Sequence, residues 1–192
     1  FFLIPLGGTI LSLSTMSLAI FYYIFGFAFF NQVEVKNLFK KEAYKESSVL
    51  KIAGAIVTGI GLSTTSLGIL FKVQKWPLAN ENIMAGLFFI IIVSAIAIFK
   101  FLKNKNVYYK RILIRTLIAF VFGILFLRLS GHDITKIEFR NYPDYIKAYE
   151  LSTANPNNDS LQKNLDLELK KTYMDQETFA AYLKEIENQK QK

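Results

Sequence analysis

The chain has 192 residues, of which 52% are hydrophobic and 15% aromatic, and its formal net charge is +8. Cysteine is absent and histidine occurs once, which excludes a disulfide framework, a thiolate nucleophile and metal sites rich in Cys or His. The basic excess is confined to residues 1–130, which hold 14 Lys and Arg against 4 Asp and Glu, whereas residues 131–192 hold 9 against 11. Because this excess accompanies apolar runs, it indicates membrane topology and no nucleic-acid partner.

Four apolar runs predict transmembrane helices at about 6–30, 52–71, 83–101 and 108–130. A helix of about 20 residues crosses the ~30 Å hydrocarbon core, and the alternation of a membrane barrel is absent. The predicted fold class is therefore all-α: a polytopic membrane domain in residues 1–130, followed by a helical extramembrane tail in residues 131–192. Residue 1 is Phe and not Met, so we expect residues upstream. The first run is too long for a signal peptide, and we interpret it as a retained helix.

Small residues recur at intervals of four and three in the first two runs. They are Gly8, Ser12, Thr15 and Ala19 in the first run, and Gly54, Thr58, Gly61, Thr65 and Gly68 in the second. Such a stripe lets another backbone approach closely, so we predict that these are helix-packing positions. Matching stripes also suggest that the two helices pack on each other. The alternative is that Gly and Ser are simply common in membrane helices.

The polar segment between the first two runs, residues 31–51, contains five lysines. Its apolar residues predict a short interfacial helix lying over the lysines. They are Val33, Val35, Leu38 and Phe39. An ordinary charged loop fits this segment equally well.

The turn between the second and third runs contains Trp76, the single tryptophan, followed by Pro77. Tryptophan and lysine gather at the membrane–water interface, so we predict that Trp76, Lys72 and Lys75 form an interfacial anchor. Pro77 is expected to stop the helix, and Glu81 to cap the next one.

Counting Lys and Arg gives a topology. The segments that flank the second and fourth runs on their N-terminal sides, 31–51 and 100–111, hold ten. The hairpin turn and the start of the tail hold five. The positive-inside rule therefore predicts that those two segments lie inside, and that the N-terminal end, the hairpin turn and the tail lie outside.

The tail is predicted to be helical from Pro143 onward, because proline is favoured in a first helical turn. A polar loop near Pro156 separates this helix from helices over 161–173 and 175–187. The pair resembles a single tetratricopeptide-like unit, and one such unit cannot bury its own apolar face.

Groups that carry chemistry are few. His132 and Asp133 predict a polar cap at a helix end, with a catalytic or pH-sensitive pair as the alternative. No phosphate- or dinucleotide-binding glycine motif is present, and no acidic residue lies inside an apolar run. We therefore predict no catalytic, cofactor-binding or metal-binding residue, and no enzyme activity.

The run from Phe71 to Pro77, Phe-Lys-Val-Gln-Lys-Trp-Pro, follows a glycine-rich helix and precedes a second apolar helix. This arrangement resembles the transmembrane hairpin of the membrane subunit of the gliding-motility and type 9 secretion motor of Bacteroidota. The resemblance covers residues 52–100 and implies an inner-membrane protein whose hairpin turn faces the periplasm. The motor subunit couples proton flow through a glutamate in its second hairpin helix, and residues 83–99 contain no acidic residue. The resemblance therefore implies the hairpin without the motor activity.

Together with the resemblance, these features predict a non-catalytic accessory or scaffold subunit of a larger bacterial inner-membrane complex, linked to protein secretion or gliding machinery, with its tail in the periplasm. Its expected partners are other membrane-protein subunits and the lipid bilayer. A small transporter or channel is the alternative, with Ser and Thr side chains of the first two helices lining its path. A third option is a membrane enzyme on the outer face, using Glu81, His132, Asp133 and Arg140.

Overall fold

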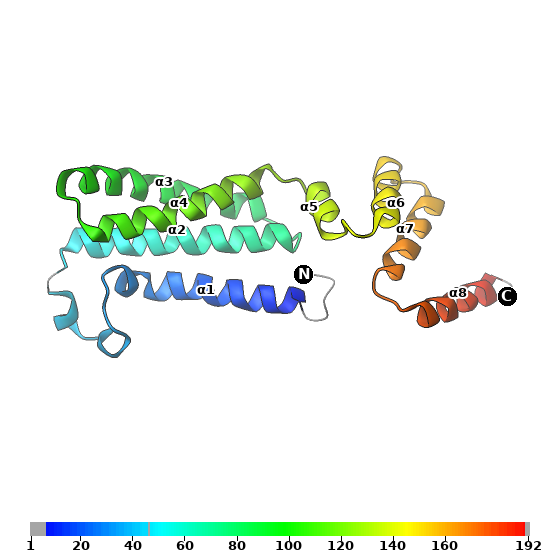
Figure 1. Ribbon diagram of the computed structural model, residues 1–192, viewed down its shortest axis with the longest axis horizontal. Helices are drawn as coiled ribbons and strands as arrows, with labels where there is room; N and C mark the ends of the chain where they lie inside the picture. The colour runs from blue at the N-terminus through cyan, green and yellow to red at the C-terminus, as the bar shows by residue number, and fades with distance from the viewer. Residues whose placement is uncertain (1–6, 46, 191–192) are drawn as a thin grey trace. The chain divides into compact units, whose positions relative to one another are not determined.

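The structure is a computed structural model that describes residues 7–45 and 47–190 (Figure 1). The described residues form eight α-helices and two short 3-10 helices, so the predicted all-α fold class is confirmed. Contacts divide the chain into two compact units: a helical bundle, Gly8–Gly131, and a C-terminal unit that begins at His132. Each unit is described by itself.

The bundle consists of four long helices whose neighbours along the chain run in opposite directions (Figure 1). They are α1 (Gly7–Phe30), α2 (Val49–Val73), α3 (Ala79–Asn104) and α4 (Val107–Arg128). The first three are each long and apolar enough to cross a membrane, and α4 qualifies when it is counted together with α5 (Gly131–Glu138). The described residues thus contain three or four candidate spans, against the four that were predicted.

The segment between α1 and α2 holds only two short 3-10 turns, η1 (Val35–Asn37) and η2 (Lys41–Tyr44). The described part of this segment is therefore the charged loop and not the interfacial helix. The Tyr44 hydroxyl donates a hydrogen bond to the Leu38 carbonyl at 2.9 Å, which holds the loop together. Ser48 then caps α2, because its hydroxyl accepts a hydrogen bond from the Lys51 N–H.

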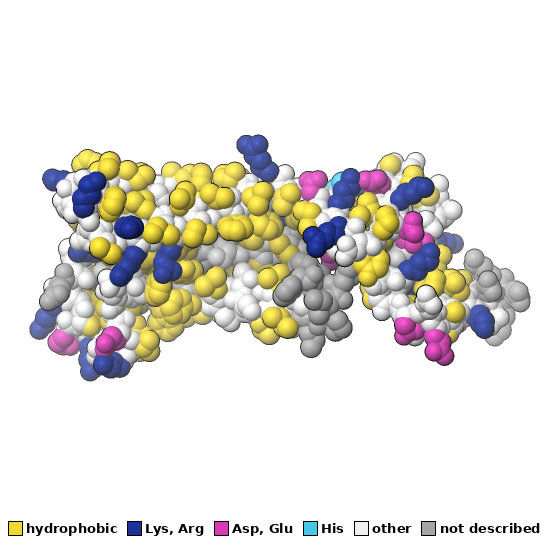
Figure 2. Space-filling view, in the orientation of Figure 1, with side chains coloured by type: hydrophobic (Ala, Val, Ile, Leu, Met, Phe, Trp, Pro, Cys, Tyr) yellow, Lys and Arg dark blue, Asp and Glu magenta, His cyan; other side chains and the backbone are white. Residues whose placement is uncertain are grey.

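The bundle core lies where α2, α3 and α4 meet. It is built from aliphatic side chains that are almost fully buried, among them Leu62, Ile83, Leu87, Ile90 and Ile112. The outward faces of α3 and α4 are also apolar but exposed, for example at Phe88, Ile91, Leu117 and Val121. Figure 2 shows this hydrophobic surface along the bundle. An apolar exterior around an apolar core is typical of helices that lie in lipid.

The C-terminal unit contains α5 and three further helices, α6 (Pro143–Ala154), α7 (Asp159–Lys171) and α8 (Gln176–Lys190). Its buried centre includes Ile134, Phe139, Tyr145 and Ala148, and the rings of Phe139 and Tyr145 lie 4.1 Å apart. The helices expected from Pro143 onward are present with shifted ends, whereas α5 was not predicted.

Two helices of the C-terminal unit, α7 and α8, begin at side-chain caps. The Asn158 side chain accepts hydrogen bonds from the N–H groups of Ser160 and Leu161 at the start of α7. The Asp175 carboxylate accepts one from the Thr178 N–H at 2.8 Å, which starts α8. This bond stabilises the ionised form and lowers the pKa of Asp175. Both helices therefore begin where water-exposed helices usually do, at an Asn or Asp.

Candidate functional site

The small-residue stripe of α2 contacts α3. A Cβ atom on Gly68 would lie 2.6 Å from the Ile83 nitrogen, and one on Gly61 would lie 3.3 Å from the Gly86 oxygen. On the facing helix, a Cβ on Gly86 would lie 2.5 Å from the Thr65 nitrogen. At Gly68 and Gly86 only glycine permits this approach, so α2 and α3 meet backbone to backbone there. The partner suggested from the sequence was the first helix, and the structure places α3 there instead.

The opposite side of α2 receives α1 through Gly59, a residue outside the stripe. A Cβ on Gly59 would lie 2.4 Å from the Tyr22 oxygen and 3.3 Å from the Gly26 Cα atom. Gly59 and Gly61 are two positions apart, and on a helix such positions face roughly opposite directions. One face of α2 thus binds α3 and the other binds α1, which a search for a single stripe does not find.

The predicted small residues of α1 lie along the same helix. Ala19 is buried, with 1% of its surface exposed. The Ser12 hydroxyl donates to the Gly8 carbonyl at 2.8 Å and accepts a hydrogen bond from the Gln74 amide at 2.8 Å. Gln74 follows the last turn of α2, so these bonds join α1 to the hairpin end of the bundle. Thr15 is half-buried.

The hydroxyl groups inside the bundle are used by the helices themselves. Thr58, Thr65 and Thr116 each donate to the carbonyl four residues earlier, at 2.6, 2.8 and 3.0 Å. Ser94 of α3 donates to the Thr116 hydroxyl of α4 at 2.9 Å and joins those two helices. In the described residues, no buried side-chain nitrogen or oxygen lacks a hydrogen-bond partner. The arrangement fits helix packing, because a polar path needs groups that face water or a substrate.

The hairpin turn between α2 and α3 is tight. Lys75 and Leu78 both adopt a positive φ, 57° and 61°, which non-glycine residues rarely do. The Trp76 ring lies 5.3 Å from the Phe71 ring and remains 42% exposed. The Lys72 ammonium donates to the Asn80 side chain at 2.7 Å across the turn. The three predicted anchor residues thus lie together at the end of the hairpin, where an interfacial belt would hold them.

The structure differs from the prediction in the roles of Pro77 and Glu81 at the helix ends. The helix α2 ends at Val73, four residues before Pro77, and a left-handed residue at Lys75 turns the chain. Glu81 lies exposed in the first turn of α3, but the N-cap residue is Leu78, which makes no side-chain capping bond. An acidic residue in a first turn still complements the helix dipole.

Arg115 of α4 lies among aromatic rings of α1. Its guanidinium donates to the Tyr22 hydroxyl at 3.2 Å and lies 4.3 Å from the Phe29 ring centre and 5.9 Å from that of Phe30. Its charge is held by a cation–π contact, which joins α4 to α1.

Two of the residues considered for an outer-face enzyme, His132 and Arg140, lie in different local environments. His132 stacks on the Tyr149 ring at 5.3 Å, and its Nε2 atom lies 3.7 Å from the Glu150 carboxylate. The same carboxylate accepts a hydrogen bond from the Lys136 ammonium at 2.6 Å, and this bond lowers the pKa of Glu150. Arg140 is exposed in the turn after α5. In the part of the chain that the structure describes, no three His, Asp or Glu side chains gather as a metal site.

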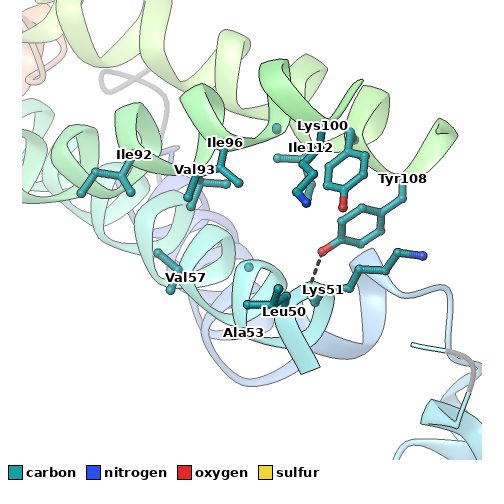
Figure 3. Close-up of a pocket in the computed structure, with 13 residues that line it drawn as sticks. Leu50, Lys51, Ala53, Val57, Ile92, Val93, Ile96, Lys100, Tyr108 and Ile112 are labelled. Atoms are coloured by element: carbon teal, nitrogen blue, oxygen red, sulfur yellow. Dashed lines mark hydrogen bonds between the residues drawn. The ribbon is translucent and has the colours of Figure 1, made fainter. Parts of the chain in front are cut away.

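A cleft of about 280 Å³ lies where α2, α3 and α4 meet near the charged loops (Figure 3). Its walls are almost entirely apolar and include Val57, Val93, Ile96 and Ala97. Its polar residues come from three helices: Lys51 of α2, Lys100 of α3, and Tyr108 and Tyr109 of α4. The Tyr108 hydroxyl donates to the Lys51 carbonyl at 2.6 Å, and the Lys51 ammonium lies 5.7 Å from the Tyr108 ring centre. This cleft could not be predicted from the sequence, because its walls come from three separate helices.

Comparison with protein-family models, curated protein sequences and solved structures found no match for this chain. The class of protein is therefore argued from the length and composition of its own helices. Three or four of them are long and apolar enough to cross a bilayer, and shorter helices follow. The chain is a multi-pass membrane protein.

Proposed function

We propose that this chain is a non-catalytic accessory or scaffold subunit of a larger bacterial inner-membrane complex. The resemblance of residues 52–100 to the hairpin of the gliding and type 9 secretion motor suggests that the complex belongs to that kind of machinery. The helices show that the chain is a multi-pass membrane protein, and its role in an assembly is what we propose.

The observation that carries the proposal is the apolar side of α8. Phe179, Tyr182, Leu183 and Ile186 recur at helical spacing on this side. The helix meets α7 through contacts of Lys170 with the Tyr182 ring and of Lys171 with the Phe179 ring. Leu183 remains exposed. A helix with an apolar side that its own unit covers only in part is typical of a partner-binding element.

The bundle supports the same proposal. The contacts of α2 with α3 are backbone to backbone, and the Thr58 and Thr65 hydroxyls donate to carbonyls of α2 itself. The transporter or channel alternative predicts ion flux when the protein is reconstituted in liposomes. An accessory subunit predicts none.

The proposed topology rests on charge. The loop from α1 to α2 and the turn from α3 to α4 lie at the same end of the bundle (Figure 1). Lys and Arg side chains gather at this end (Figure 2). By the positive-inside rule this end faces the cytoplasm, and the single span α2 that follows the loop places the hairpin turn in the periplasm. The helix α4 has 22 residues, which is long enough to cross the hydrocarbon core. If α4 is the fourth span, the tail is periplasmic.

The test is the size of the complex extracted from native membranes in mild detergent, measured by blue native electrophoresis. We expect an assembly much larger than the 22.0 kDa chain. Leu183→Asp with Ile186→Asp should dissociate it, because the added charges lie on the apolar side of α8. The matched control, Ala181→Asp with Asn188→Asp, adds the same charge on the opposite side and should leave it intact. A lone monomer with a folded tail would contradict the proposal.

A further inference from the structure

The cleft between α2, α3 and α4 has the composition of a lipid-binding site. Leu50, Ile92 and Ile96 line it and are exposed, so it opens on the outer surface of the bundle. That surface is the apolar one that faces lipid in a membrane protein. An occupant reaching the cleft from the side is therefore an acyl chain or another apolar group.

Two lysines mark one end of the cleft. Lys51 lies in the first turn of α2 and Lys100 near the last turn of α3, so both are at a helix end. Figure 3 shows the Lys100 side chain directed into the cleft, and the Lys51 side chain passing the Tyr108 ring and pointing away from the interior of the cleft. Among the described carboxylates, none forms an ion pair with either lysine. The N-terminal end of α2 adds a partial positive charge at the same place.

The apolar part of the cleft extends from the lysines toward the middle of the bundle. Ile92 lies eight residues before Lys100 on the same helix, which corresponds to about 12 Å along the axis. The cleft thus joins a cationic rim at the level of the headgroups to an apolar trough that reaches into the hydrocarbon region. Basic pockets between membrane helices bind the headgroups of anionic lipids.

We propose that this cleft binds an anionic phospholipid, with one acyl chain between Val57 and Ile96 and the phosphate held by Lys100 and Lys51. The charge of the rim selects an anionic headgroup over a zwitterionic one. The apolar walls select a lipid over free phosphate. This site does not depend on the assembly role proposed above.

The test is native mass spectrometry of the full chain in detergent, titrated with phosphatidylglycerol or with phosphatidylcholine of the same acyl chains. We expect phosphatidylglycerol to bind more tightly. Lys51→Gln with Lys100→Gln should weaken its binding about 25-fold, at roughly fivefold for each lysine, and should leave phosphatidylcholine binding unchanged. The control, Lys103→Gln with Lys105→Gln, removes the same charge from two exposed lysines outside the cleft and should have little effect.

A second variant tests the apolar part. Ala53 is exposed and lines the cleft, so Ala53→Phe should fill it and reduce binding of both lipids. Ala85→Phe places the same ring on an exposed part of α3 outside the cleft and should not. Circular dichroism of each variant confirms that it is folded. Equal binding of the two lipids, equal loss in both lysine pairs, or unchanged binding in Ala53→Phe would each overturn the proposal.

Discussion

The bundle and the C-terminal unit pack their helices in different ways. In the bundle, α2 meets α3 at Gly68 and Gly86, where an added Cβ would lie 2.6 and 2.5 Å from a backbone nitrogen, and the Thr58 and Thr65 hydroxyls donate to carbonyls of α2 itself. In the C-terminal unit, aromatic rings in contact with one another fill the centre. Lysine–carboxylate pairs lie on its surface, as between Lys136 and Glu150.

This difference follows from the two solvents. Lipid tails are as apolar as leucine, so membrane helices gain little by burying leucine and associate through close backbone contact. In water, burial of large apolar side chains supplies most of the stability. Up to about residue 130 the helices therefore pack as membrane helices do, and after it they pack as helices in water do. The predictions below test that division.

The largest expected effect is in the C-terminal unit. Phe139→Ala removes a ring that is 6% exposed and lies against Tyr145, so it should cost about 4 kcal/mol. A unit this small has little stability to spare. Hydrogen exchange measured by mass spectrometry should show that α6 loses protection while α2 keeps it. Tyr173→Ala removes an exposed ring, 61% accessible, and should change neither helix. Loss of protection in α2 would show that the two units are energetically coupled.

An intermediate effect is expected in the bundle. Gly86→Ala would place a methyl group 2.5 Å from the Thr65 nitrogen and 2.3 Å from its hydroxyl oxygen. The helices must separate to admit it, at a cost of about 2 kcal/mol. Thermal unfolding in detergent should register the loss. Gly131→Ala is the matched control, because a Cβ there meets nothing within 4 Å. If Gly86→Ala were neutral, backbone contact would not be what holds α2 to α3.

The smallest effect concerns the surface pair of Lys136 and Glu150. The hydrogen bond from Lys136 lowers the pKa of Glu150, so the stability this carboxylate contributes is present above its unfolded pKa and is lost as the pH falls through the folded pKa. Lys136→Ala should raise the pKa of Glu150 toward its ordinary value. An NMR titration of the Glu150 side chain measures the shift. Lys147→Ala removes an exposed lysine from α6 and serves as the control.

Composition and hydrophobic run length were sufficient to predict the all-α membrane fold and the positions of the long helices. Helix ends were less accurate: α3 begins at Ala79 and not at residue 83, because polar residues of its first turn reduce the apolar signal. The helix α5 was missed, since its eight residues are too few to show a helical period. This helix is stabilised by burial of Ile134 and Thr135 in the C-terminal unit. Such burial depends on the tertiary structure and cannot be read from the sequence.

The packing positions show a second limit. The stripe containing Gly61, Thr65 and Gly68 was visible in the sequence, but its partner was not, because spacing specifies a face and not what covers it. Gly59 was missed since it lies off the stripe. The cleft was missed for a related reason: Lys51 and Lys100 contribute to a topology count individually, and only the fold brings them to one rim.

The short turn at residues 74–78 also bears on how the protein is made. Because α2 and α3 are consecutive and antiparallel, their contacts join residues close in sequence, such as Thr65 and Gly86, and little loop entropy opposes their formation. The pair can close as soon as α3 has left the ribosome, before Arg115 of α4 exists to bind Tyr22 of α1. The hairpin is therefore the part of the bundle that biosynthesis completes first, and α1 and α4 are added to it from either side.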